Sequence, residues 1–198
     1  AVGILTVLFN RQILKYLGTN ALAVYGIIVN ISSFVQCCAY SVGQASQPII
    51  SMNLGTKLGG RIKQTLDMRW NQLLFSVLDG LSLIAPMLYV RIFMTPTKEI
   101  LEIAPSIIRS YGISFLLLPL NVFSTYYFQA MVKPTAAFLI SVARGLVLSG
   151  ILIFLLPIIA GANAIWFAMP ITELIIAIFV IALIIRYTKQ LPVQKKNS

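Results

Sequence analysis

The sequence ALAVYGIIVNISSFVQCCAYSVGQASQPIISMNLG, residues 21–55, contains no Asp, Glu, Lys or Arg. A helix needs roughly 20 apolar residues to cross the hydrocarbon core of a bilayer, and residues 21–53 exceed that length. Spanning β-strands would instead alternate in hydropathy over about ten residues. The stretch therefore predicts a membrane-spanning helix, long enough to extend beyond the bilayer or to bend at Gly43 and Pro48.

Five further apolar stretches have the same character. Apolar residues make up 59% of the 198 positions and charged residues only 10%, against about 25% charged residues in soluble domains. Water does not solvate a surface so poor in charge, so lipid must surround much of the chain. The sequence predicts an all-α integral membrane protein, a six-helix transmembrane bundle with spans at about 1–17, 21–53, 70–94, 103–131, 135–159 and 163–187, followed by a cytoplasmic tail at 188–198.

The charged residues, 15 Lys and Arg against 5 Asp and Glu, lie mostly between the apolar stretches. If the spans alternate in direction, nine basic residues fall on one side: Lys57, Arg61, Lys63, Arg69, Lys133, Arg186, Lys189, Lys195 and Lys196. The opposite side holds four: Arg11, Lys15, Arg91 and Lys98. Because loops rich in Lys and Arg face the cytoplasm, we expect a multi-pass protein of the cell membrane with a cytoplasmic C-terminus. No basic patch is interleaved with aromatic residues, so nucleic acid is not expected as a partner.

Residue types needed for enzymatic chemistry are scarce. The sequence has no histidine, and its two cysteines, Cys37 and Cys38, are adjacent within an apolar run. Imidazole-based metal sites and Ser-His-Asp triads are therefore excluded. The five acidic residues are scattered, without paired carboxylates or a metal-ligand cluster. We expect no enzyme, no catalytic residues, no metal and no cofactor.

Polar residues recur within two of the predicted spans. In 21–53 they follow steps of three and four, which keeps them near one helical face: Asn30, Ser33, Gln36, Tyr40, Gln44, Gln47 and Ser51. Span 103–131 has a sparser series: Ser110, Ser114, Asn121, Thr125 and Gln129. A polar face is costly against lipid, so it faces either other helices or a wet cavity. Two such faces favour a water-accessible path between them.

Four ionisable residues lie within or near the spans: Asp79, Arg109, Arg144 and Glu173. Glu173 is ten residues into the last predicted span, near the middle of the membrane. A carboxyl there is a candidate for ion or substrate contact. Two other interpretations stay open: an ion pair with Arg144 of the preceding span, and a protonated side chain without a functional role. Asp79 is nearer a membrane boundary, and Arg109 is placed to reach the headgroups.

Several stretches together resemble bacterial members of the multidrug and toxic compound extrusion (MATE) transporters. The pattern Gly43-Gln44, Gln47-Pro48 and Asn53-Leu54-Gly55 is similar to the eighth helix of that family. Further stretches follow in the family's order, at the end of helix ten, in helix eleven and at the start of helix twelve: TYYFQAMVKP (125–134), ISVARGLVL (140–148) and AIWFAMPITEL (164–174). The resemblance covers nearly the whole chain.

The resemblance implies a transporter of twelve helices in two six-helix lobes around a central cavity. This chain would be the C-terminal lobe, from within helix seven through helix twelve, and its partners would be the N-terminal lobe, the lipid bilayer and amphipathic small-molecule substrates. The implied activity is secondary active efflux of amphipathic, often cationic compounds in exchange for H⁺ or Na⁺. Some branches carry a cation-binding acid in helix ten, whereas this sequence has none between Glu102 and Glu173. Because the chain begins at Ala1 inside an apolar run, we expect it to be a piece of a longer protein.

The candidate residues for the substrate or ion pathway are Asn30, Gln36, Tyr40, Gln44, Gln47, Asn121, Tyr126, Gln129, Arg144 and Glu173. One alternative function is a flippase lobe for a lipid-linked precursor, which needs a more cationic cavity than Arg109 and Arg144 supply. Another is an inactive fragment. A membrane enzyme, such as a lipid transferase, is disfavoured by the lack of paired carboxylates.

Overall fold

The computed structural model describes residues 2–56, 58–66, 86–93 and 95–189, and the regular elements in these ranges are all helical. In chain order they are α1 (Val2–Tyr16), α2 (Gly18–Gly55), α3 (Gly59–Leu66), α5 (Pro86–Phe93), α6 (Lys98–Gly112), the 3₁₀ turn η1 (Ile113–Leu116), α7 (Leu118–Ala130), α8 (Pro134–Val142), the π-helical turn η2 (Ala143–Val147), α9 (Leu148–Ala160), the 3₁₀ turn η3 (Ala162–Phe167) and α10 (Ala168–Lys189). The predicted all-α fold class is confirmed.

Four helical runs within the described residues are long and apolar enough to cross a membrane: Gly18–Gly55, Lys98–Ala130, Pro134–Ala160 and Ala162–Lys189. The predicted span 1–17 corresponds to α1, which has 15 residues. The predicted span 70–94 lies largely outside the described residues, and α5 is its described end. Most of the predicted tail, 188–198, also lies outside them. The exact membrane limits of the spans therefore stay predictions.

Short interruptions with clear chemical causes separate the helices. Gly18, the first residue of α2, has φ +83°, and Gly161, between α9 and η3, has φ +86°. This left-handed backbone favours glycine because it has no Cβ. At the start of α6 the hydroxyl oxygen of Thr97 accepts a hydrogen bond from the amide of Ile100 at 3.4 Å, which caps a free donor of the first turn. Two glycines and one capping threonine thus mark where helices begin or end.

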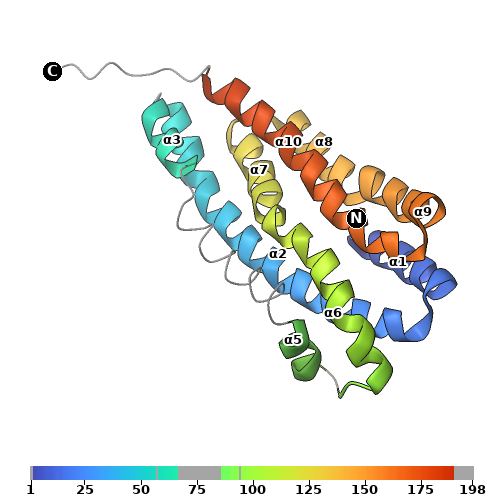
Figure 1. The fold of residues 1–198 in the computed structure, drawn as a ribbon. Coiled ribbons are helices and arrows are strands. Elements are labelled where there is room, and N and C mark those ends of the chain that lie inside the picture. The colour runs from blue at the N-terminus through green and yellow to red at the C-terminus, as the bar shows by residue number, and fades with distance from the viewer. Residues whose placement is uncertain (1, 57, 67–85, 94, 190–198) are drawn as a thin grey trace.

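Helix α2 packs along α7 and also contacts α1 and α6, while α10 packs against α7 and α9 (Figure 1). Two buried clusters hold this arrangement together. The first contains an aromatic group in which Phe9 of α1 stacks on Tyr25 of α2 with ring centres 5.0 Å apart. The second joins Tyr127 and Phe128 of α7 to Val180 of α10. The bundle therefore has a packed core at both ends of α2 and α7.

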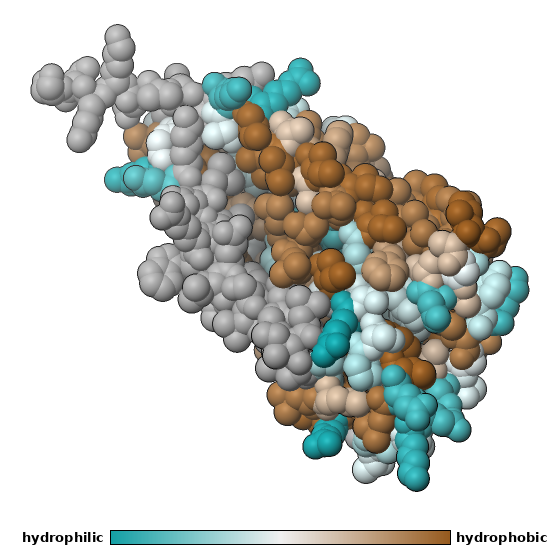
Figure 2. All heavy atoms as spheres, viewed as in Figure 1, coloured by the Kyte–Doolittle hydropathy of each residue, from teal (hydrophilic) through white to brown (hydrophobic). Residues whose placement is uncertain are grey.

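The outer surface of α9 and α10 is strongly apolar. Ile158 of α9 is 71% exposed and Ile178 of α10 is 63% exposed. Figure 2 shows a broad hydrophobic area over α10 and the helices beside it. Such an area is unfavourable in water, whereas lipid solvates it well, as expected for a membrane-spanning bundle.

Candidate functional site

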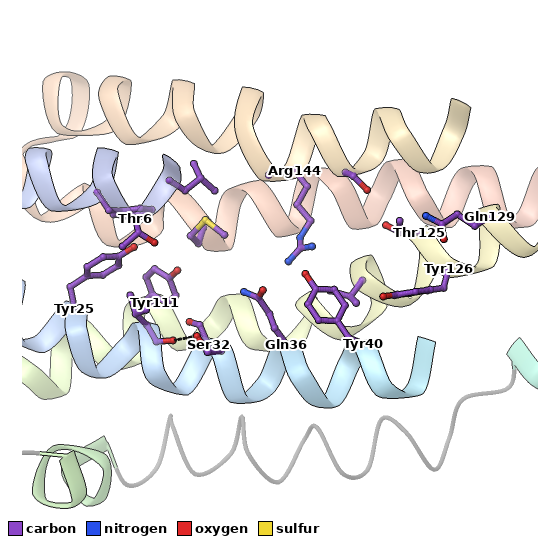
Figure 3. A pocket seen from close by; sticks show the side chains of 18 residues that line it. Thr6, Tyr25, Ser32, Gln36, Tyr40, Tyr111, Thr125, Tyr126, Gln129 and Arg144 are labelled. Atoms are coloured by element: carbon purple, nitrogen blue, oxygen red, sulfur yellow. Dashed lines mark hydrogen bonds between the residues drawn. The ribbon is translucent and has the colours of Figure 1, made fainter. Parts of the chain in front are cut away.

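A cavity of about 350 Å³ lies between the long helices. It is bounded by side chains from both halves of the chain (Figure 3): Leu5, Thr6, Phe9, Tyr25, Val29, Ser32, Ser33, Gln36, Tyr40, Tyr111, Val122, Thr125, Tyr126, Gln129, Ser141, Arg144, Gly145 and Met169. Its volume falls within the range of about 300–1,000 Å³ that is usual for small-molecule sites. The cavity is therefore the candidate functional site.

One wall of the cavity is aromatic and polar. Tyr40 of α2 and Tyr126 of α7 meet edge to face, with ring centres 6.3 Å apart and an interplanar angle of 71°. Gln36 of α2 and Gln129 of α7 also line the cavity, on either side of this aromatic pair along the bundle (Figure 3). The site thus offers ring surfaces and hydrogen-bonding amides to the same ligand.

The position of the Tyr126 ring depends on Gly43 of α2. A Cβ atom at position 43 would lie 2.3, 2.8 and 2.9 Å from three atoms of that ring. These separations are far shorter than the 3.5–4.0 Å of a normal carbon–carbon contact. Only glycine at position 43 therefore leaves room for the ring of Tyr126 where it stands.

Arg144 and Glu173 form an ion pair at the edge of the cavity. The Nε atom of Arg144 donates to Oε1 of Glu173 at 2.8 Å. The Glu173 side chain is 0% exposed, and the Arg144 side chain is 16% exposed. Of the three interpretations of Glu173 drawn from the sequence, the structure contains the ion pair. The pair offsets much of the cost of removing both charges from water.

Asn121 of α7 completes the environment of the buried carboxylate. Its Nδ2 donates to Oε2 of Glu173 at 2.6 Å and to the backbone carbonyl of Glu173 at 2.9 Å. The Ser124 hydroxyl donates to the carbonyl of Asn121 at 2.7 Å. Both carboxylate oxygens of Glu173 therefore accept a hydrogen bond from within the protein, one from each neighbouring helix run.

Arg144 lies on the π-helical turn η2, which joins α8 to α9. A π turn leaves backbone carbonyls with weaker helical partners, and such turns often occur at functional sites. Here the hydroxyl of Ser149 donates to the carbonyl of Arg144 at 2.9 Å. The bulge is thus stabilised directly at the residue whose side chain enters the cavity.

The structure brings seven of the ten candidate residues to this region. Gln36, Tyr40, Tyr126, Gln129 and Arg144 line the cavity, whereas Asn121 and Glu173 are fully buried beside it. Asn30, Gln44 and Gln47 are not among its described lining residues. At about 100° per residue, Asn30 is rotated about 120° from Gln36, and Gln47 lies about 10 Å beyond Tyr40 along the axis of α2. The predicted polar face is therefore only partly a cavity wall.

Other lining residues were not among the candidates. Tyr25 shares the helical face of Gln36, since 11 residues make about three turns, so a search along the face of Gln36 rather than that of Asn30 would have found it. Thr6 and Phe9 of α1, and Tyr111 of α6, line the cavity without any distinguishing sequence pattern. Within the described ranges, no three acidic or Cys side chains gather in a metal-binding group.

Comparisons with known proteins connect this fold to transport. The chain matches the MatE family over residues 3–155. One similar solved structure is described as the outward-facing conformation of a multidrug resistance MATE family transporter of the MOP superfamily, with TM-score 0.84 and 15% identity over 96% of this chain and 43% of that one. Another is a MOP superfamily transporter from Pyrococcus furiosus, with TM-score 0.83 and 14% identity over 96% of this chain and 43% of that one. The description of that second structure states that reverse polarity of its binding pocket suggests a different function. No curated protein matches the chain. The chain spans less than half the length of both solved proteins.

Proposed function

The chain belongs to the MatE family of multi-pass membrane transporters, which are not enzymes, and from this premise we propose a specific transport role. The chain forms one lobe of a secondary active antiporter that exports amphipathic, often cationic compounds in exchange for H⁺ or Na⁺. The other lobe of the same protein supplies the rest of the pathway. The protein lies in the cell membrane, with the basic loop after α2 and the C-terminus on the cytoplasmic side, where Lys and Arg are favoured.

The observation that carries this proposal is the cavity between the apolar helical runs. Its Tyr40 and Tyr126 rings meet edge to face at 6.3 Å and present ring surface to a flat ligand. A cation over such a ring gains about 0.5–2 kcal/mol. Gln36 and Gln129 add hydrogen-bonding groups that water or a polar substrate atom can use. This combination suits amphipathic compounds of varied shape, because ring stacking is less directional than hydrogen bonding.

The coupling ion is H⁺ or Na⁺, and Glu173 supports the site rather than binding the ion in this conformation. Both of its carboxylate oxygens accept hydrogen bonds, and its side chain is fully buried. An ion entering there would have to displace Arg144 or Asn121.

A flippase for a lipid-linked precursor is the weaker candidate. Such a substrate carries a pyrophosphate, which calls for several cations around one cavity. Arg144 is the one charged residue among the described residues that line this cavity, and its charge is balanced by Glu173. Export of amphipathic compounds without a polyanionic group suits this cavity better.

The test is ethidium transport by the full-length protein in proteoliposomes, under an imposed pH gradient and, separately, a sodium gradient. We expect transport under one of the two gradients and a clear loss in Y40A and Y126A. Y16A is the matched control, because Tyr16 is on α1 and is not among the described cavity-lining residues. Absence of ethidium transport under both gradients, with correctly folded protein, would overturn the proposal.

A further inference from the structure

We propose that Arg144 forms a subsite for the carboxylate of an aromatic substrate, so that this lobe favours zwitterionic compounds over their purely cationic esters. This inference deepens the proposed transport function and rests on it. The carboxylate would contact the terminal guanidinium nitrogens of Arg144, while the aromatic part of the ligand would contact Tyr40 and Tyr126.

The negative charge near the cavity is not accessible to a ligand. Glu173 is 0% exposed, with Oε1 held by Arg144 at 2.8 Å and Oε2 held by Asn121 at 2.6 Å. No acidic side chain is among the described residues that line the cavity. A cationic group of a substrate therefore finds ring faces and amides here, but no carboxylate.

The positive charge, in contrast, faces the cavity. Arg144 uses only Nε toward Glu173, and its two terminal nitrogens make no hydrogen bond within the described part of the chain. A guanidinium has five N–H donors, four of them on the terminal nitrogens. Figure 3 shows this end of Arg144 pointing across the cavity toward Gln36 and Tyr40. Two parallel N–H donors in a plane match the two oxygens of a carboxylate.

The Arg144 side chain is also held in place before any ligand binds. Its Nε is fixed by Glu173, which Asn121 in turn fixes, and its backbone carbonyl is bonded by Ser149 at 2.9 Å. A side chain ordered in advance loses little conformational entropy on binding. This arrangement favours a binding role for the free donors over a purely structural role for the ion pair.

The surroundings of Arg144 define the rest of the ligand. The cavity of about 350 Å³ fits one compact molecule, whereas a membrane lipid with two acyl chains is too large for it. Tyr40 and Tyr126 supply ring surface at the end of the cavity nearer the C-terminal ends of α2 and α7. The ligand class is therefore a small aromatic compound with a carboxylate. Because Glu173 balances the charge of Arg144, the expected gain is that of a charge-assisted hydrogen bond, not of an isolated buried cation.

The test compares two compact dyes that differ only at the carboxyl group: rhodamine 110, whose aryl carboxylate is free, and its methyl ester rhodamine 123, which is a cation. Binding of each dye to the purified full-length protein is measured by fluorescence polarisation, and export by proteoliposomes. The unaltered protein should bind the acid more tightly than the ester. In R144Q the dissociation constant of the ester divided by that of the acid should fall by about tenfold. This factor corresponds to the loss of one charge-assisted hydrogen bond.

A second variant protects the test against misfolding. R144Q alone leaves Glu173 buried without a counter-charge, so the double variant R144Q/E173Q removes both charges together and keeps the site neutral. It should lose the preference for the acid, measured as the ratio of the two dissociation constants. An unchanged acid-to-ester ratio in the double variant would refute the carboxylate subsite. If the ester is exported and the acid is not favoured, this inference fails and the proposed transport function stands, whereas export of neither dye contradicts the transport function itself.

Discussion

The substitution G43A tests whether the aromatic wall of the cavity depends on the close approach of α2 and α7. The new Cβ would lie 2.3 Å from Cδ2 of Tyr126 and within 2.9 Å of two further ring atoms. The Tyr126 ring must move away from position 43 to restore a normal contact, and this movement alters its edge-to-face packing on Tyr40. Forcing an extra methyl group into a packed site costs about 1–3 kcal/mol.

The control is G26A in the same helix, where nothing lies within 4 Å of the new Cβ. Both substitutions gain the same preference of alanine over glycine in a helix, about 1 kcal/mol. The difference in stability between the two variants therefore isolates the clash, and we expect G43A to be less stable than G26A by about 1–3 kcal/mol. Equilibrium unfolding of the full-length protein in detergent measures this difference.

The double variant G43A/Y126A links the loss of stability to the ring. If the clash with Tyr126 is the cause, G43A in the Y126A background should change stability by about as much as G26A does, because only the helix preference of alanine remains. Ethidium affinity should fall in G43A and stay unchanged in G26A. Equal stability of G43A and G26A, or an undiminished effect of G43A in the Y126A background, would refute the packing argument.

Three further predictions concern the groups around the cavity. In N121A the buried carboxylate of Glu173 loses its second donor, so the unfolding free energy should fall by about 1–3 kcal/mol. The control S41A, whose hydroxyl is exposed, should change it by less than about 0.5 kcal/mol. Unfolding in detergent measures both variants, and equal effects would contradict a supporting role for Asn121. S149A removes the hydroxyl that donates to the Arg144 carbonyl and should destabilise the π turn by about 1 kcal/mol. Hydrogen exchange within residues 143–149 should become faster. Unchanged exchange there would show that the Ser149 hydroxyl does not stabilise the turn. Y40A should weaken ethidium binding roughly fivefold, about 1 kcal/mol of lost ring contact, and Y40F should restore it; failure of Y40F to restore binding would assign the effect to the hydroxyl group instead.

The helical fold followed from the hydropathy of the sequence alone. Residues 21–55 have no charge, and they form one continuous helix, α2, over Gly18–Gly55. The long stretch from 134 to 160 is also helical throughout, but its centre is the π turn η2. Periodicity could not reveal that turn, because it depends on where Ser149 and the ion pair of Arg144 satisfy the backbone and side chain.

Part of the site was also accessible to sequence reasoning. Steps of three and four along residues 30–51 placed Gln36 and Tyr40 on one face, and both line the cavity. Asn30 does not, because the real helical period rotates it away from that face. Pairing of Glu173 with Arg144 was one of three interpretations, and only the register of α10 against η2 decides among them. The contact of the Tyr126 ring with Gly43 likewise depends on how α2 and α7, which are far apart in the sequence, align in space.

The central question for this protein is whether substrate occupies the cavity between α2, α7 and η2. In the full-length protein with Cys37 and Cys38 replaced by alanine, a cysteine is introduced at Gln129, which lines the cavity, or at Ile158, which is 71% exposed on the apolar face of α9. The rate of reaction with a hydrophilic maleimide is then measured with and without ethidium. We expect Q129C to react and ethidium to slow its reaction several-fold, whereas I158C should react poorly and be insensitive to ethidium. Labelling of Q129C at the same rate in saturating ethidium would contradict the assignment of this cavity to the substrate pathway.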